Sequence, residues 1–215
     1  MASRRGRLIV IAGPSGVGKG SVVRRLLDMD LAEGSEEPAR EPAKETGRLA
    51  YSVSVKTRAP RANERDGREY YFISEQAFDE MLRNGELLEW APFVDHRSGT
   101  PRTFVEESLA AGRDVILEID VKGAEQVRRQ VPSAVLIFLA PPSIEELERR
   151  LRGRGTEDDE RIARRLETAA WEMTQRPWFD HVVVNDDLER AAAEVAAIIE
   201  ASRTGHLSGH PEETV

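Results

Sequence analysis

The sequence predicts an α/β fold in which helices flank a parallel β-sheet. Short apolar runs of strand length alternate with helical patterns along much of the chain, which is the rhythm of βαβ units. A glycine-rich segment joins the first apolar run to the first helix. Between about residues 50 and 112 the pattern changes to short alternating strands around one helix, which indicates an inserted subdomain. With 215 residues, the chain can form one domain that carries such an insertion.

The expected core consists of the segments 5–30, 113–150 and 166–203. Its strands are the apolar runs at about 8–12, 114–119, 134–139 and 181–184, with helices at about 18–29 and up to about 130. Ser143 and Glu146 form a capping box that opens a charged helix. An alanine-rich amphipathic helix is expected from Asp187 to Arg203. These helices should cover the faces of the sheet.

The expected subdomain spans residues 49–112 and is mixed α/β. Its strands are predicted at 51–55, 69–73 and 87–93, and its helix begins after Ser74 and ends at Asn84-Gly85. Residues 151–165 combine glycines with many charges between two helices, which is typical of a small mobile lid. The Glu/Pro/Ala-rich stretch 31–48 is expected to be a flexible loop, and the polar stretch 204–215 a disordered tail.

A phosphate-binding loop lies between the first strand and the first helix. In the pattern GxxxxGK[ST], backbone N–H groups wrap a phosphate, the lysine reaches the β- and γ-phosphates, and the hydroxyl meets Mg²⁺. Here the hydroxyl position holds Gly20, and the hydroxyl follows one residue later. The loop predicts a nucleoside polyphosphate site made by Gly13, Pro14, Ser15, Gly16, Val17, Gly18, Lys19, Gly20 and Ser21.

Composition argues against several classes of function. A net charge of −8 disfavours general binding to nucleic acid or membranes, so local groups of cations must hold any anionic ligand. Because the chain has no cysteine, disulfides, thiol catalysis and cysteine-ligated metals are excluded. The basic first residues lead directly into a strand and the phosphate loop, which is not the layout of a signal peptide, and no apolar run approaches transmembrane length. We therefore expect a cytoplasmic protein.

Several motifs after the phosphate loop resemble the guanylate kinase family. They follow the family's order from about residue 7 to 201 and include Ser52 to Ser54, Thr57 to Arg61, Tyr70 to Phe72, Glu86 to Ala91, Ser98 to Thr100, Leu117 to Asp120, Phe138 to Ser143, Arg150 to Glu157 and Val184 to Asp187. The resemblance implies a P-loop NTPase-type core, a nucleoside-monophosphate-binding subdomain and a lid. It also implies transfer of the γ-phosphoryl of ATP to GMP, and to dGMP, with Mg²⁺ as cofactor.

The resemblance also implies roles for individual residues. The catalytic cations would be Lys19, Arg150, Arg154 and Arg165. Asn185 and Asp186 would border the adenine of ATP, although they could instead cap the following helix. The residues implied for GMP are Ser54, Arg58, Arg61, Glu64, Tyr70, Glu89, Thr100, Glu118 and Asp120. Arginine suits this role because its fork meets phosphate oxygens bidentately, and an anionic phosphate nucleophile needs no catalytic base.

Guanine presents N1–H and N2–H₂ donors beside the O6 acceptor, so its site needs a carboxylate near a hydroxyl. The family pattern places Glu89 and Asp120 at the donor edge, with Ser54 and Thr100 near O6. Glu118 and Asp120 alternate with apolar residues, which predicts that both carboxylates share one face of their strand. Asp120 could instead hold Mg²⁺ through water. The candidate metal ligands are therefore Ser21 and Asp120.

Three positions depart from the family pattern. Gly20 replaces the usual loop hydroxyl, which predicts that activity survives with an altered Mg²⁺ dependence. Ser98 stands where many members carry a tyrosine that touches the GMP phosphate, and serine is too short for that contact. Arg97 and His96 are neighbouring candidates to replace it. Lys56 takes the place of a small hydroxyl residue.

Two other functions remain as alternatives. A related kinase acting on another nucleoside monophosphate or phosphorylated metabolite would account for the departures at Gly20 and Ser98. An inactive module of this family that binds proteins would need no intact phosphate loop, yet the chain keeps Lys19 and the lid arginines. The sequence therefore favours the ATP:GMP phosphotransferase.

Overall fold

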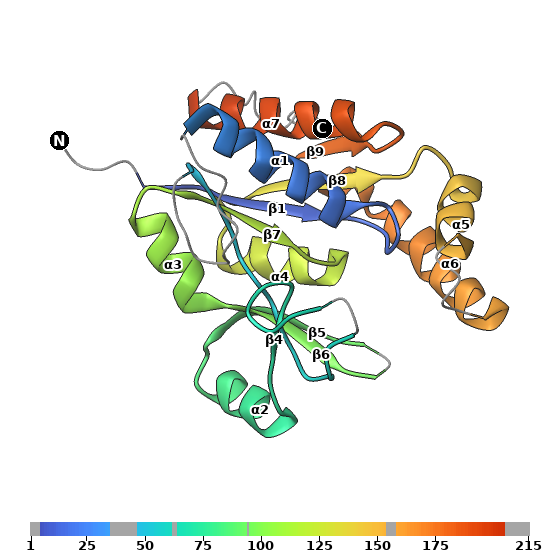
Figure 1. The fold of residues 1–215 in the computed structure, drawn as a ribbon, viewed down its shortest axis with the longest axis horizontal. Coiled ribbons are helices and arrows are strands. Elements are labelled where there is room, and N and C mark those ends of the chain that lie inside the picture. Colours follow the sequence, from blue (N-terminus) through green and yellow to red (C-terminus); the bar gives the residue numbers. More distant parts are fainter. Residues whose placement is uncertain (1–4, 35–46, 62–63, 94, 154–157, 205–215) are drawn as a thin grey trace, which may run out of the picture.

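The computed structural model describes residues 5–34, 47–61, 64–93, 95–153 and 158–204. Its larger sheet has five parallel strands (Figure 1). In spatial order they are β2 (Leu49–Tyr51), β7 (Asp114–Glu118), β1 (Leu8–Ala12), β8 (Val135–Ala140) and β9 (His181–Val184). This order places β1, the strand before the phosphate loop, at the centre of the sheet. The predicted α/β fold with a parallel core is confirmed.

Helices cover both faces of this sheet, which explains why β1 and β8 read as continuous apolar runs. Ile9 and Ile11 face the helices α1 (Lys19–Gly34) and α7 (Leu188–Thr204). Leu8 and Val10 face the opposite side, where they pack with residues of α3 (Arg102–Ala110) and α4 (Val121–Gln130). Figure 1 shows α1 and α7 side by side above the sheet and α3 and α4 below it.

A smaller sheet lies beyond α4, at the lower end of Figure 1. Its order is β4 (Tyr71–Phe72), β3 (Val55–Lys56), β6 (Arg97–Pro101) and β5 (Leu87–Pro92). The helix α2 (Glu75–Arg83) packs on it through Phe78, which contacts Val55 and Leu87 in a separate apolar cluster. As predicted, Ser74 caps α2, since its hydroxyl accepts a hydrogen bond of 3.1 Å from the N–H of Ala77.

The structure corrects four element assignments. The expected strand 51–55 is divided, because Leu49–Tyr51 pairs with β7 of the larger sheet while Val55 begins β3 of the smaller one. The stretch 69–73 contributes only the two-residue strand β4. The strand β6 was not predicted, since its sequence RSGTP has no apolar alternation and its backbone pairing with β5 forms it. The helix α3 was also missed, and its Val105 and Leu109 pack in the larger core.

The helices α5 (Ile144–Arg152) and α6 (Asp159–Thr174) leave the carboxyl end of β8 and extend to the right in Figure 1, and the 3₁₀ helix η1 (Arg176–Trp178) follows α6. The predicted cap at Ser143 is present, at 3.1 Å from the N–H of Glu146. The helix α1 continues to Gly34, past residue 31 where the flexible loop was expected to start. The remainder of that loop from residue 35 to 46, part of the lid at 154–157 and the tail from residue 205 lie outside the described residues.

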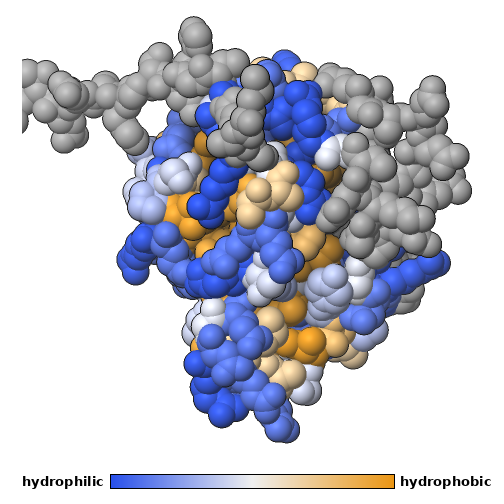
Figure 2. All heavy atoms as spheres, turned by 90° about the vertical axis from the view of Figure 1, so that its left-hand side faces the viewer, coloured by the Kyte–Doolittle hydropathy of each residue, from blue (hydrophilic) through white to orange (hydrophobic). Residues whose placement is uncertain are grey.

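Polar side chains dominate the face shown in Figure 2, and apolar side chains show through in patches on both the larger body and the smaller lobe. This pattern matches the amphipathic helices that cover the two sheets. Across the described residues, no helix combines the length and hydropathy that a membrane crossing requires.

Candidate active site

The phosphate loop is a tight turn between β1 and α1 whose glycines adopt conformations that other residues disfavour. Gly13, Gly16 and Gly18 have φ angles of 145°, 95° and 100°. At Gly13 a Cβ would also lie 2.2 Å from the carbonyl oxygen of Leu139. The backbone amides of such a loop, together with the amino-terminal end of α1, form a concave site that attracts phosphate.

Two cations lie against the loop itself. Lys19 Nζ donates hydrogen bonds to the carbonyl oxygens of Gly13 (2.6 Å) and Pro14 (3.2 Å), so the ammonium lies over the turn. Arg165, from α6, donates a hydrogen bond to the Ser15 hydroxyl. The structure thus brings Lys19 and Arg165, two of the predicted catalytic cations, to the same turn although they are far apart in the sequence.

The side chains of Arg150 and Asn185 both donate hydrogen bonds to the backbone of the phosphate loop. Arg150 donates to the carbonyl oxygens of Val17 (3.2 Å) and Asn185 (3.0 Å), and Glu146 accepts from its Nε at 2.7 Å. The buried Asn185 side chain donates to the same Val17 oxygen at 2.7 Å. In this arrangement both predicted residues contact loop backbone. Their neighbour Asp186 pairs with Arg190 on α7, and the predicted Arg154 lies outside the described residues.

A buried carboxylate marks the predicted guanine site. Glu89 on β5 is only 5% exposed, and its Oε1 accepts a hydrogen bond of 2.7 Å from the Thr100 hydroxyl. Its Oε2 lies 2.5 Å from the point where a Cβ on Gly123 would stand, and Asp120 Oδ1 lies 3.2 Å from the same point. The structure therefore brings Glu89, Thr100 and Asp120 together. Ser54 directly precedes Val55, the first residue of β3, and is also buried.

Burial raises the pKa of Glu89 to about 7, because the charged form loses hydration that its surroundings do not replace. The hydrogen bond from Thr100 opposes this shift, and the negative charge of Asp120 adds to it. A buried carboxylate with one oxygen that accepts no hydrogen bond from the described residues is the feature expected of a site that accepts hydrogen bonds from a ligand.

Two glutamine side chains fix the strand that carries Glu89. Gln126 on α4 donates to the Trp90 carbonyl at 2.7 Å and accepts from the Trp90 N–H at 3.2 Å. Gln130, one turn later, donates to the Leu88 carbonyl at 2.6 Å. These bonds flank Glu89 and attach β5 to the larger body. Sequence reasoning missed them, since glutamines on an amphipathic helix look like ordinary surface residues.

Glu118 and Asp120 lie at the carboxyl end of β7 and contact different neighbours. β7 ends at Glu118, and Asp120 is the N-cap of α4, with its Oδ1 accepting from the Gly123 N–H at 2.6 Å. The alternation of the strand continues to Ile119, which packs in the same cluster as Leu117 and donates to the Ile11 carbonyl, so the shared face of the two carboxylates stays a prediction. Glu118 lies at the phosphate loop, near the Tyr51 hydroxyl (3.4 Å), and a Cβ added to Gly20 would stand 3.3 Å from its Oε2.

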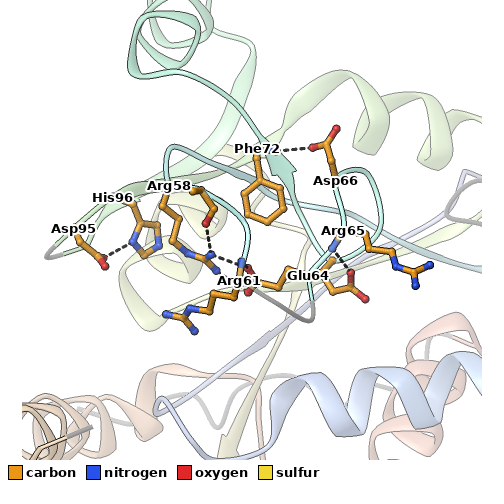
Figure 3. Close-up of polar contacts among 10 residues, drawn as sticks. Arg58, Arg61, Glu64, Arg65, Asp66, Phe72, Asp95 and His96 are labelled. Atoms are coloured by element: carbon orange, nitrogen blue, oxygen red, sulfur yellow. Dashed lines mark hydrogen bonds and ion pairs between the residues drawn. The ribbon is translucent and has the colours of Figure 1, made fainter. Parts of the chain in front are cut away.

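Arg58, Arg61 and Glu64, which the resemblance assigns to GMP, form one group (Figure 3). Arg58 makes a bidentate ion pair with Glu64, with N–O distances of 2.6 and 2.7 Å. Glu64 also accepts a hydrogen bond of 2.9 Å from the Arg61 N–H. The Tyr70 ring lies 5.7 Å from the Arg58 guanidinium. Arg58 lowers the pKa of Glu64 to about 2, so this carboxylate is ionised and holds the arginine in place. The Nε atom of Arg58 is buried without a hydrogen-bond partner within the described structure.

Glu172 on α6 is a further buried carboxylate, and no motif indicated it. It is 6% exposed, and burial raises its pKa to about 7, opposed by the charge of Lys19 and increased by that of Asp120. It therefore belongs to the electrostatic surroundings of the loop lysine. From the sequence, a glutamate in such a charged helix would be expected to face solvent. Only the packing of α6 shows that Glu172 is buried.

Comparisons with known proteins identify the family of this chain. The guanylate kinase family model matches residues 5–202. A guanylate kinase of Thermus thermophilus is 48% identical over 94% of this chain and 83% of its own length. One of Parasynechococcus marenigrum is 50% identical over 90% of this chain and 98% of its own. The crystal structure of guanylate kinase from Anaplasma phagocytophilum has a TM-score of 0.72, 31% identity, and coverage of 94% and 88% of the two chains. This chain belongs to the guanylate kinase family.

Proposed function

We propose that the phosphate loop of this chain holds ATP, that the smaller sheet holds GMP, and that the γ-phosphoryl group passes between them. The chain is an ATP:GMP phosphotransferase by its family and by the extent of its identity to curated guanylate kinases. From the positions of the residues, we assign some to the ATP phosphates and others to GMP. The observation that carries the assignment of GMP is the buried Glu89 paired with Thr100.

The cations at the loop supply the positive charge that phosphoryl transfer needs. Lys19 contacts carbonyl oxygens, and we propose that it exchanges them for phosphate oxygens when ATP binds. Arg165 stands at the same turn and is assigned to the transferring group. Arg150 donates to the loop carbonyl of Val17, and we assign it to positioning the loop for ATP. Transfer to an anionic phosphate then requires alignment and charge, and no general base.

Guanine recognition is assigned to the buried carboxylates. Glu89 would accept hydrogen bonds from the N1–H and N2–H₂ donors of guanine, and Asp120 would lie beside it. Ser54 and Thr100 would face O6. AMP has no donor at N1 and would leave a buried carboxylate without its partner, which costs about 1–3 kcal/mol for each lost bond. Rejection of AMP follows from several such losses.

Magnesium is assigned to the ATP phosphates with little direct protein coordination. Within the described part of the chain, no three His, Asp or Glu side chains gather closely enough to hold a metal ion. Mg²⁺ commonly keeps several waters and binds through substrate phosphates with one or two carboxylates. The few oxygen-bearing side chains near the phosphate loop are therefore compatible with Mg²⁺ bound mainly by ATP. Ser21 and Glu118 stand at the loop, whereas Asp120 caps α4 beside Glu89. When bound, Mg²⁺ would neutralise charge on the transferring phosphates.

Changing Gly20 to serine is expected to lower the free Mg²⁺ concentration for half-maximal activity by about tenfold. A Cβ at this position would lie 3.3 and 3.4 Å from the Glu118 carboxylate oxygens, so a small shift of that flexible side chain would place the new hydroxyl beside it. Initial rates against free Mg²⁺ at fixed ATP measure the effect. Gly20→Ala is the matched control, because it adds the Cβ without the hydroxyl. Equal curves for both variants would contradict this role of position 20.

A coupled assay of ADP release with GMP, dGMP, AMP, CMP and UMP tests the proposed function. We expect GMP and dGMP to be used, and AMP to have a kcat/KM lower by at least about 10²-fold, as expected when several buried hydrogen bonds are lost. A preference for another monophosphate would support the alternative kinase. Tight ATP binding without turnover would support the inactive protein-binding module.

A further inference from the structure

Lys56 lies in the predicted GMP phosphate site, and neither the motifs nor the phosphoryl-transfer scheme gives it a role. It is the last residue of β3 and stands directly opposite Ser98 of β6 in the antiparallel register. Paired residues of neighbouring strands project their side chains from the same face. Its ammonium lies 3.6 Å from the centre of the Tyr70 ring. Among the described residues, this ammonium has no carboxylate within ion-pair distance.

The surroundings of Lys56 are rich in positive charge. The charged and titratable groups that act on it or on its neighbours are Arg58, Arg61, Glu64, Tyr70, Asp95, His96 and Glu118. Burial, followed by repulsion from Arg58, lowers the pKa of Lys56 to about 8. Three cations (Lys56, Arg58, Arg61) therefore share the nearest carboxylate, Glu64, which Arg58 already binds. Such an excess of positive charge around the largely buried Lys56 is costly unless an anion arrives.

Arg97 and His96, the two neighbours of Ser98 that could replace a tyrosine there, are engaged elsewhere. Arg97 pairs with Glu75 (2.7 Å) and Asp79 (2.7 Å), and its guanidinium lies 4.5 Å from the Phe78 ring centre, so it is held on α2. His96 Nδ1 is 2.6 Å from an oxygen of Asp95, and its ring stacks on Phe93. Burial lowers the pKa of His96, which favours its neutral form. Lys56 is therefore the cation on this strand pair whose charge is not used by an acidic partner.

We infer that Lys56 is a further phosphate-binding residue of the GMP site, reaching over Tyr70 into the space that the short side chain of Ser98 leaves open. This inference rests on the proposed GMP site. The dianionic phosphate would be met by Lys56, Arg58 and Arg61 together. The unpartnered Nε of Arg58 indicates the same ligand, since a buried donor without an acceptor is rare.

Lys56→Met tests the inference, because methionine keeps the aliphatic length and removes the charge. The KM for GMP should rise by about tenfold or more, the usual effect of losing one charge-assisted bond, while the KM for ATP stays within about twofold. Arg83→Met, at the exposed end of α2, is the matched control for removing a cation from the same subdomain and should change neither constant. An unchanged KM for GMP in Lys56→Met would overturn the inference.

The pH profile gives an independent readout. Lys56 is charged below a pKa of about 8, so kcat/KM for GMP should fall as the pH rises through about 8 to 9.5. Lys56→Met should lose this limb. The pKa of Tyr70 is raised and that of His96 lowered from their ordinary values, so neither group titrates in this window. A wild-type profile that matches the variant's would contradict the assignment.

A strand-pair exchange and a second single variant separate the possible failures. Lys56→Ser combined with Ser98→Tyr should recover most of the GMP affinity that Lys56→Ser loses alone, since the two side chains occupy facing positions. Arg58→Met should raise the KM for GMP strongly if the site itself is correct. An effect at Arg58 with none at Lys56 would reject only this inference, whereas no effect at either would reject the proposed GMP site.

Discussion

Lys19→Met is expected to lower kcat by about 10²–10³-fold, the usual cost of removing one charged donor that stabilises a transition state. The ammonium already lies over the loop, 2.6 Å from the Gly13 carbonyl, where phosphate oxygens would replace that partner. Methionine keeps the length of the side chain but offers no donor. Because charge develops on the phosphoryl group during transfer, kcat should change more than the KM for either nucleotide.

The measurement is single-turnover and steady-state ADP release with saturating ATP and GMP. Arg129→Met removes a cation from the exposed last turn of α4 and should retain full activity. Thermal unfolding of the Lys19 variant should remain cooperative, because the hydrogen bonds from the Lys19 ammonium to Gly13 and Pro14 are confined to the loop. A kcat within tenfold of the wild-type value in Lys19→Met would contradict the assignment of this loop to the reacting phosphates.

Glu89→Gln is expected to lower kcat/KM for GMP by about 10³-fold, because a buried site then presents a donor to a donor. The amide oxygen can still accept from the Thr100 hydroxyl, so the local structure should persist. The amide N–H₂ would face the N1–H and N2–H₂ groups of guanine. The loss should appear with GMP and not in the affinity for ATP.

Glu89 also predicts a pH dependence. Its pKa is raised to about 7, so the carboxylate is increasingly protonated below that pH and cannot accept from both guanine donors. The wild-type kcat/KM for GMP should therefore rise with pH through about 7. Together with the fall assigned to Lys56, this gives a bell-shaped profile with a narrow maximum between about 7 and 8.

The matched control for Glu89→Gln is Glu86→Gln, the same change at an exposed residue just before β5. It should leave kcat/KM for GMP and its pH profile unchanged. Because the pKa of Glu89 is raised on folding, its ionised form opposes folding above pH 7, so Glu89→Gln should not lower the melting temperature at pH 8. A destabilised variant with unaltered selectivity for GMP over AMP would assign Glu89 to structure alone.

The parts of the fold that were predictable are those with a strong local signal. β1 and β8 are buried on both faces and read as apolar runs, and Ser74 and Ser143 cap their helices as their positions indicate. The strand β6 was missed because its residues RSGTP carry no strand pattern. Its pairing with β5 is a contact between backbones, which no side-chain pattern records.

The candidate site shows the same division. The spacing of the phosphate loop predicted Lys19, whereas the resemblance to the family implied Arg58 and Glu89. Alternation also predicted one face for Glu118 and Asp120, and the structure gives these carboxylates different hydrogen-bond partners, the Tyr51 hydroxyl for Glu118 and the Gly123 N–H for Asp120. Glu172 carried no signal, because burial by a neighbouring helix is not written in the residue or its immediate neighbours.

By itself, the sequence determined the parallel core, the phosphate loop and the family, because these depend on local hydrophobic patterns and on residue types at fixed spacing. The tertiary structure decided which carboxylates are buried and which cations are already engaged. Arg97 is held on α2, while Lys56, across the strand pair from Ser98, lies over the Tyr70 ring near Arg58. Such assignments depend on register and on partners distant in the chain, and only the folded arrangement defines them.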